Sequence, residues 1–155
     1  MLKALLIAAT VVVCCPLLPA QSPVQIFASG TLVIGSRAVS CGKTVAIYDS
    51  SLKDAAETDA KGQILLNPNW FAAEPALLQL WRYSHECAHV MGQKDEQAAD
   101  CWAVTNAVRE GWLSATDFDR LKAMFGTEAT DSVHLPGAGR IAAMQRCFVK
   151  PLSSS

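Results

Sequence analysis

The stretch HECAHVMGQKDEQAAD, residues 85–100, contains two of the chain's three histidines and four of its acids. On an α-helix His85 and His89 lie one turn apart on the same face, so one nitrogen from each ring can bind the same metal ion. Glu86 lies one step further around the helix and can reach water at that ion without being a ligand. The pattern His-Glu-x-x-His is typical of zinc hydrolases, in which this glutamate is the general base.

A catalytic zinc ion needs a third protein ligand, and the sequence offers two candidates for it. One is Asp95, in a pattern H-E-x-x-H-x-x-G-x-x-D that resembles a minority of metzincin peptidases. The other is Glu96, which has Asp100 one turn later on the same helix face. If the chain reverses at Gly92, Asp100 lies opposite His85 and can accept a hydrogen bond from its non-ligating nitrogen. We favour Glu96 on this geometry, because the Asp95 alternative leaves Asp100 without a role. Asp95 itself is explained well as an acid at a helix start.

A further pair of candidate residues lies downstream, in HLPGAGRIAAM. His134 and Arg140 flank a segment rich in Pro and Gly, which we expect to fold as a loop over a cleft. An imidazole and a guanidinium at that place would stabilise the oxyanion that forms when water attacks a carbonyl. The alternative is that His134 is an ordinary surface histidine and that Arg140 only begins a helix.

The elements around these residues predict an α+β fold, a minimal zincin-like domain with a small twisted sheet packed on the active-site helix and two or three further helices. Pro75 suits the first turn of that helix and Gly92 suits its left-handed end. The expected strands lie within residues 24–35, 44–49 and 62–68, and the expected helices span about 75–91, 93–110, 114–125 and 140–148.

The first twenty residues have the features of a cleaved secretory signal: Lys3, an apolar stretch at 4–18 and the small Ala20. Residues 21–155 are then expected to form one domain in the periplasm or outside the cell, with no membrane span. The net charge is -1 and the basic residues are scattered. This charge distribution excludes a surface for nucleic acid or for anionic lipid.

Four cysteines remain after the signal, namely Cys41, Cys87, Cys101 and Cys147. An even number in an oxidising compartment favours two disulfides, and the three possible pairings stay open. Zinc binding by the thiolates is disfavoured, because none of the four stands in a C-x-x-C spacing. Cys87 lies about half a turn from the face of the two motif histidines, so we assign it to a disulfide or to packing.

The large apolar side chains before the motif are expected in the core and not in a substrate pocket. They are Trp70, Phe71, Leu77, Leu78, Leu80 and Trp81.

The order H-E-x-x-H, then E-x-x-A-D, then His and Arg six residues apart resembles the gluzincin metallopeptidases that include HtpX and the CAAX prenyl endopeptidase. The resemblance covers residues 62–147. It implies that zinc is bound by the two motif histidines and Glu96, that Asp100 supports a ligand, and that His134 and Arg140 line the active site. The stretch GQILLNPNWF, residues 62–71, resembles the family's edge strand, where a substrate strand would pair.

The expected function is therefore that of a zinc-dependent endopeptidase acting on a peptide or an unfolded protein, with Glu86 as general base. Two alternatives stay open: a metal-binding module without turnover, and a zinc amidase that acts on cell-wall peptides.

Overall fold

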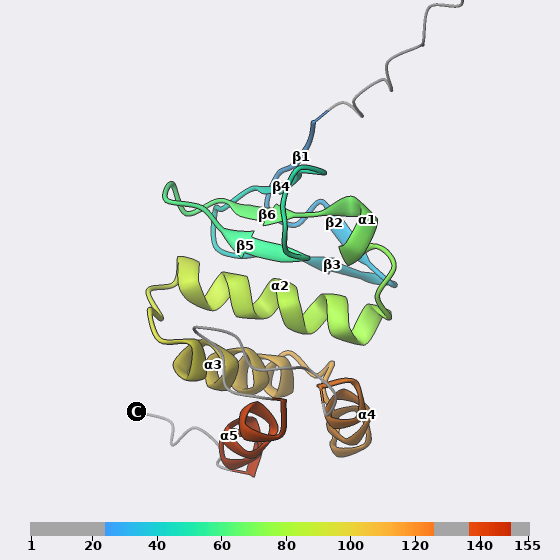
Figure 1. Cartoon of the computed structure of the whole chain (residues 1–155), viewed down its shortest axis with the longest axis vertical. Coiled ribbons are helices and arrows are strands. Elements are labelled where there is room, and N and C mark those ends of the chain that lie inside the picture. The colour runs from blue at the N-terminus through green and yellow to red at the C-terminus, as the bar shows by residue number, and fades with distance from the viewer. Residues whose placement is uncertain (1–23, 126–136, 150–155) are drawn as a thin grey trace, which may run out of the picture.

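The computed structural model describes residues 24–125 and 137–149, and it shows the α+β fold that the sequence predicts. In this part of the chain the strands form a four-stranded and a two-stranded sheet, and helices follow them. Figure 1 shows three layers, of which α2 is the middle one. The sheets lie on one side of α2, and the helices α3, α4 and α5 lie on the other. The elements are β1 (Gln25–Phe27), β2 (Leu32–Ile34), β3 (Arg37–Val39), β4 (Ala46–Tyr48), β5 (Ala56–Thr58), β6 (Ile64–Leu66), α1 (Pro68–Phe71), α2 (Ala76–Val90), α3 (Glu96–Arg109), α4 (Ala115–Phe125) and α5 (Gly137–Val149).

The four-stranded sheet has the order β1-β4-β6-β5, in which β4 and β6 are parallel and the other neighbours are antiparallel. Alternate residues of a strand face opposite sides of a sheet. Ile64 and Leu66 are accordingly buried in the core that α2 shares with the sheet, whereas Leu65 is only partly buried. The expectation that residues 62–71 provide an edge strand is wrong, because β6 has a neighbour on each side and β5 forms the edge.

The two-stranded sheet is a hairpin of β2 and β3 that turns at Gly35. Gly35 has a φ of +62°, and a Cβ there would lie 3.3 Å from the Cβ of Ala76 at the start of α2. Glycine is therefore favoured both by the backbone conformation and by the close approach of α2. The run expected at 24–35 is divided between β1 and β2, because the chain turns at Gly30, whose φ is +82°.

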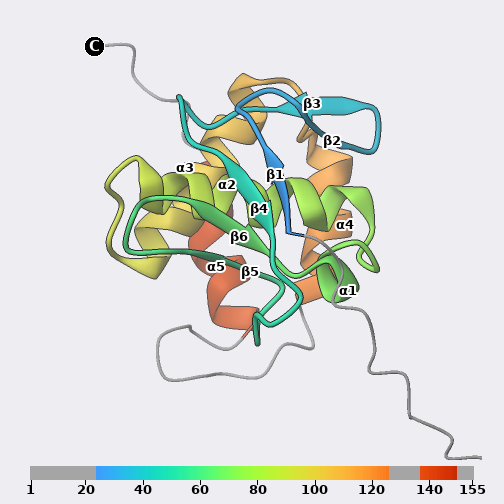
Figure 2. The same cartoon turned by 90° about the horizontal axis from the view of Figure 1, so that it is seen from above.

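The central helix α2 has a hydrophobic core on each side. It lies between the sheets and the later helices in Figure 1 and crosses beneath the sheet strands in the view of Figure 2. Pro75 is its N-cap, so the helix begins one residue later than expected, and Gly92 ends it with a φ of 97° as predicted. Leu77, Leu78 and Trp81 pack in the core shared with α3, α4 and α5. Tyr83 and Cys87 pack in the core shared with the sheets.

The helices after α2 begin at positions that differ from the expected ones. Asp95 is the N-cap of α3, so this helix starts at Glu96 and not near Gln93. The start of α5 at Gly137 places Gly137–Arg140 in the first helical turn. This part of the segment rich in Pro and Gly therefore does not form the expected loop over a cleft.

Most of the expected core residues are buried, with two exceptions. Trp70 is 53% exposed, so its assignment to the core is wrong, and Leu80 is only partly buried. Phe71, Leu77, Leu78 and Trp81 are buried as predicted. None of the helices in the described part of the chain is long and apolar enough to cross a membrane.

Two disulfides join the elements that surround the motif. Cys41 is bonded to Cys87 of α2, and Cys101 of α3 is bonded to Cys147 of α5. The structure thus selects one of the three possible pairings and confirms that Cys87 is a disulfide residue. Two disulfides indicate an oxidising, exported compartment. The expected signal segment and His134 lie outside the described residues.

Candidate metal centre

Three potential ligand atoms meet between α2 and α3. His85 Nε2 lies 3.1 Å from His89 Nε2 and 3.0 Å from Glu96 Oε2, and His89 Nε2 lies 3.5 Å from the same carboxylate oxygen. Three ligands at ~2.0–2.1 Å from a tetrahedral zinc ion would lie about 3.3 Å from one another. The triangle of donor atoms therefore has the size that one small metal ion requires. The group formed by His85, His89 and Glu96 could hold such an ion.

Both imidazole rings are oriented by a hydrogen bond on the nitrogen that faces away from this triangle. His85 Nδ1 lies 2.9 Å from Asp100 Oδ1, and His89 Nδ1 lies 2.7 Å from the backbone oxygen of Gln93. Both of these oxygens are acceptors when Asp100 is ionised, so each Nδ1 carries the proton. Each Nε2, in the neutral ring, can then offer a lone pair to a cation. Metal-binding histidines in proteins are commonly held by a carboxylate or a backbone carbonyl in this way.

Asp100 is in turn bound by Arg140 of α5. Arg140 Nε donates to Asp100 Oδ2 at 2.9 Å, and Nη2 donates to Oδ1 at 2.7 Å. Asp100 is 1% exposed and Arg140 is 6% exposed, so the pair is removed from water. The Arg140 guanidinium also lies over the ring of Trp81, 5.0 Å from its centroid. Arg140 therefore supports the Asp100 carboxylate from inside the protein, which differs from the expected contact with an oxyanion in a cleft.

The electrostatics of the centre favour a positive charge between its carboxylates. Burial lowers the pKa of His85, but hydrogen bonds to Asp100 and Glu96 outweigh burial and raise this pKa to about 9. Burial raises the pKa of Asp100, but hydrogen bonds from His85 and Arg140 outweigh burial and hold this pKa below its usual value. Without a metal ion, a proton on His85 supplies the positive charge that the two carboxylates require. A divalent cation would supply it in the metal-bound protein.

Glu86 points to the sheet side of α2, where β5 holds it. The Thr58 hydroxyl lies 2.9 Å from Glu86 Oε2 and 2.9 Å from the backbone oxygen of Glu86. Glu86 is 8% exposed, so its carboxylate is largely shielded from water. This contact connects the edge strand β5 directly to the proposed general base.

Asp95 has a different role from Glu96, although the two residues are adjacent. The Asp95 side chain accepts a hydrogen bond of 2.9 Å from the backbone nitrogen of Ala98 and thereby caps α3. It is exposed and does not belong to the group that could hold a metal ion. The alternative explanation of Asp95, an acid at the start of a helix, is the one that the structure supports.

The structure brings together His85, His89, Glu96 and Asp100 as the helix periodicity predicted, whereas Glu86 projects toward β5 and is not part of the group that could hold a metal ion. It also adds a residue that the sequence did not indicate. Thr58 lies 28 positions before Glu86 in a three-residue strand, AET, that has no alternating apolar pattern. No motif in the sequence could have identified Thr58 as a partner of Glu86.

Comparison with models of protein families, with curated proteins and with solved structures gives no match.

Proposed function

We propose that the protein is an exported zinc-dependent endopeptidase in which Glu86 is the general base. The observation that carries this proposal is the triangle of donor atoms from His85, His89 and Glu96, with both rings oriented through their other nitrogens. Two histidines and a carboxylate leave the fourth position of a tetrahedral ion open, which is the arrangement of catalytic zinc sites. The imidazole ligands favour zinc over calcium and magnesium, which prefer oxygen ligands.

Zinc bound at this centre would polarise a peptide carbonyl and lower the pKa of water to about 7. Glu86 would accept the proton of the attacking water and later deliver it to the leaving amine. The Thr58 hydroxyl contacts Glu86 Oε2, so Oε1 is the oxygen available for this proton. Asp100 keeps the His85 proton on Nδ1 during the reaction, and Arg140 keeps Asp100 ionised.

The position of β5 supports a peptide as the substrate. β5 lies at the edge of its sheet, and one of its residues, Thr58, contacts Glu86. An extended peptide can add to a sheet edge through backbone hydrogen bonds. A peptide paired with β5 would lie beside Glu86, so we propose residues 56–58 as the substrate-binding edge.

The relation to gluzincin peptidases and the location of the protein belong to the same proposal. Glu96 as the third ligand and Asp100 beside His85 are the features that the gluzincin resemblance implies. The two disulfides support a location in the periplasm or outside the cell.

Metal analysis of purified variants tests the zinc site. Glu96→Ala should lose zinc, because it removes one of the three donor atoms. Asp95→Ala is the matched control: it removes the helix cap, which costs about 1 kcal/mol of stability, and should retain zinc. Retention of zinc by Glu96→Ala together with its loss from Asp95→Ala would transfer the ligand role to Asp95.

Activity of Glu86→Gln tests the enzyme against a metal-binding module. This variant should retain zinc and lose about 10²–10⁴-fold in the rate of casein hydrolysis, as expected for removal of a general base. Cleavage of peptidoglycan fragments but not of casein by the native protein would instead identify a cell-wall amidase. Absence of hydrolysis of both substrates by the zinc-loaded native protein would contradict the enzymatic proposal.

A further inference from the structure

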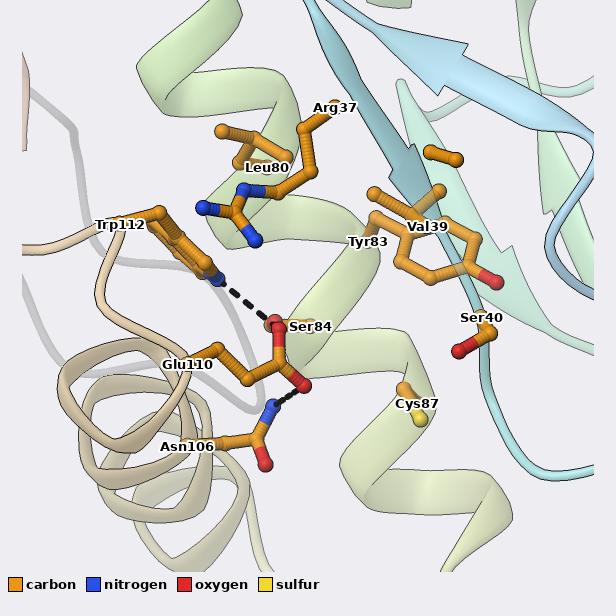
Figure 3. Close-up of a pocket in the computed structure, with 11 residues that line it drawn as sticks. Arg37, Val39, Ser40, Leu80, Tyr83, Ser84, Cys87, Asn106, Glu110 and Trp112 are labelled. Carbon is orange, nitrogen blue, oxygen red and sulfur yellow. Dashed lines mark hydrogen bonds between the residues drawn. The ribbon is translucent and has the colours of Figure 1, made fainter.

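A cavity lies against α2, on the opposite side from the metal centre. It has a volume of about 210 Å³ and lies between β3, α2 and the C-terminal end of α3 (Figure 3). The α2 residues that line it are Leu80, Tyr83, Ser84 and Cys87. At about 100° per residue this face points away from the face that carries His85 and His89. The cavity is therefore separate from the metal centre, although both are built on one helix.

Two buried polar side chains of this cavity have no hydrogen-bond partner in the described part of the chain. Ser84 is 6% exposed and Tyr83 is 4% exposed, and neither hydroxyl contacts an acceptor or a donor there. The two hydroxyl oxygens are not themselves fully enclosed, because in this part of the chain the fully buried side-chain nitrogen or oxygen without a partner is Trp81 Nε1. Accessible polar groups of this kind find their partner in water or in a ligand. A polar ligand or water in the cavity would supply this partner.

The cavity also carries one positive and one negative side chain that do not pair with each other. Arg37 of β3 forms no ion pair and donates no side-chain hydrogen bond within the described residues. Figure 3 shows its guanidinium extending over Leu80 to the side of the cavity where Trp112 lies. Glu110 has no cation partner there either.

Neighbouring donors fix the position of the Glu110 carboxylate. Asn106 Nδ2 donates to Glu110 Oε1 at 2.9 Å, and Trp112 Nε1 donates to Oε2 at 3.2 Å. Arg109 in turn donates to the amide oxygen of Asn106, so this amide is held with its NH₂ group toward Glu110. The negative charge is therefore presented at a defined place, beside the aromatic ring of Trp112 (Figure 3).

We propose that this cavity binds a free α-amino acid. Its carboxylate would pair with the Arg37 guanidinium, its ammonium group with Glu110 and the face of Trp112, and its side chain would contact Leu80. The volume equals that of about seven water molecules at ~30 Å³ each, which suits an amino acid and is below the roughly 300–1,000 Å³ of sites for drug-sized ligands. The proposal does not depend on the zinc site.

Titration calorimetry with three related probes tests the site. L-leucine should bind, whereas N-acetyl-L-leucine and L-leucinamide should each bind at least about tenfold more weakly, because each lacks one of the two charges. Arg37→Met and Glu110→Gln should each weaken L-leucine binding by about tenfold or more. Arg120→Met and Asp119→Asn change exposed residues away from the cavity and should bind like the native protein. Retained melting temperatures would show that all four variants are folded.

Several outcomes would overturn the proposal. One is equal binding of the three probes, and another is full affinity of both cavity variants. A third is no binding of L-leucine at roughly 10 mM, a concentration that saturates a site with a Kd near 1 mM. Glu96→Ala should bind L-leucine normally, so failure of the zinc proposal and failure of this one are distinguishable. A shift of the Trp112 indole NH resonance on addition of L-leucine would locate the bound ligand in the cavity.

Discussion

The two faces of α2 differ in how their polar groups are satisfied. On the face toward α3, His85 is held by Asp100, Asp100 is held by Arg140, and His89 is held by the Gln93 carbonyl. On the face toward β3, the hydroxyls of Tyr83 and Ser84 have no partner among the described residues. The first face is preorganised by the protein for a cation, although the Trp81 Nε1 buried on that side has no partner in the described part of the chain, whereas the hydroxyls of the second face are not fully buried. Variants at the two faces should therefore respond differently.

The largest expected effect comes from breaking the buried chain of hydrogen bonds at Arg140. Arg140→Met would leave the buried Asp100 carboxylate with His85 as its remaining cationic partner, and removal of one member of a buried ion pair costs about 3–5 kcal/mol of folding stability. Urea denaturation of the chelated protein measures this loss. Arg146→Met, at an exposed position of the same helix, should change stability by no more than about 0.5 kcal/mol. Equal stability of the two variants would show that the Arg140 contacts contribute nothing to the fold.

A smaller effect should follow from removing the charge of Asp100, which contacts His85, while keeping the size of its side chain. Asp100→Asn can still accept a hydrogen bond from His85 but carries no charge, and we expect a fall of about 10–100-fold in zinc affinity. Competition with a chromophoric chelator measures this affinity. Unchanged affinity would mean that the carboxylate does not influence the metal site. Asp95→Asn, at the exposed cap of α3, serves as the control and should bind zinc normally.

Thr58→Val should affect activity but not metal content. The change removes the hydroxyl that contacts Glu86 Oε2 and preserves the shape of the side chain and its suitability for a strand. Loss of one hydrogen bond to a carboxylate corresponds to about 1.5–3 kcal/mol, or roughly 10–150-fold in kcat if it acts only on the reacting Glu86. Kinetics on a fluorogenic peptide with zinc content measured in parallel would check this. A loss of zinc along with activity would instead indicate general damage to the fold.

The smallest effect is expected on the other face of α2. Ser84→Ala removes a hydroxyl that has no partner in the described part of the chain and is not fully buried, so stability should change by no more than about 0.5 kcal/mol. Thermal melting measures it. A loss of more than about 1 kcal/mol would show that the hydroxyl is satisfied after all, and the contrast between the two faces would disappear.

The sequence predicted the local part of the metal centre well, because its geometry follows from helix periodicity. The spacing of His85 and His89, the turn at Gly92 and the spacing of Glu96 and Asp100 are enough to place these side chains on facing surfaces. The same periodicity indicated the middle of each long helix. The helix ends were less predictable. Asp95 caps α3 three residues after Gly92, and α5 begins at Gly137 within a segment whose Pro and Gly residues predict a loop.

Features that depend on long-range packing could not be predicted in the same way. The interior position of β6 depends on which strands pair with it. Its apolar sequence would be the same whether the strand lay inside the sheet or at its edge. The contacts of Thr58 with Glu86 and of Arg140 with Asp100 join residues 28 and 40 positions apart, and no local pattern encodes them. The choice among three disulfide pairings likewise required the arrangement of α2, α3 and α5.

The placement of the disulfides gives the metal centre a mechanical role. Each bridge closes a loop with a separation of 46 residues, one from Cys41 to Cys87 and the other from Cys101 to Cys147, and the loops do not overlap. His89 and Glu96 lie in the short stretch between them, whereas His85 lies inside the first loop. A cation held by all three would join one covalently closed half of the molecule to the stretch that leads into the other. Without it, the two disulfide-closed loops are joined by the chain between Cys87 and Cys101 and by the packing of α2 on α3, α4 and α5.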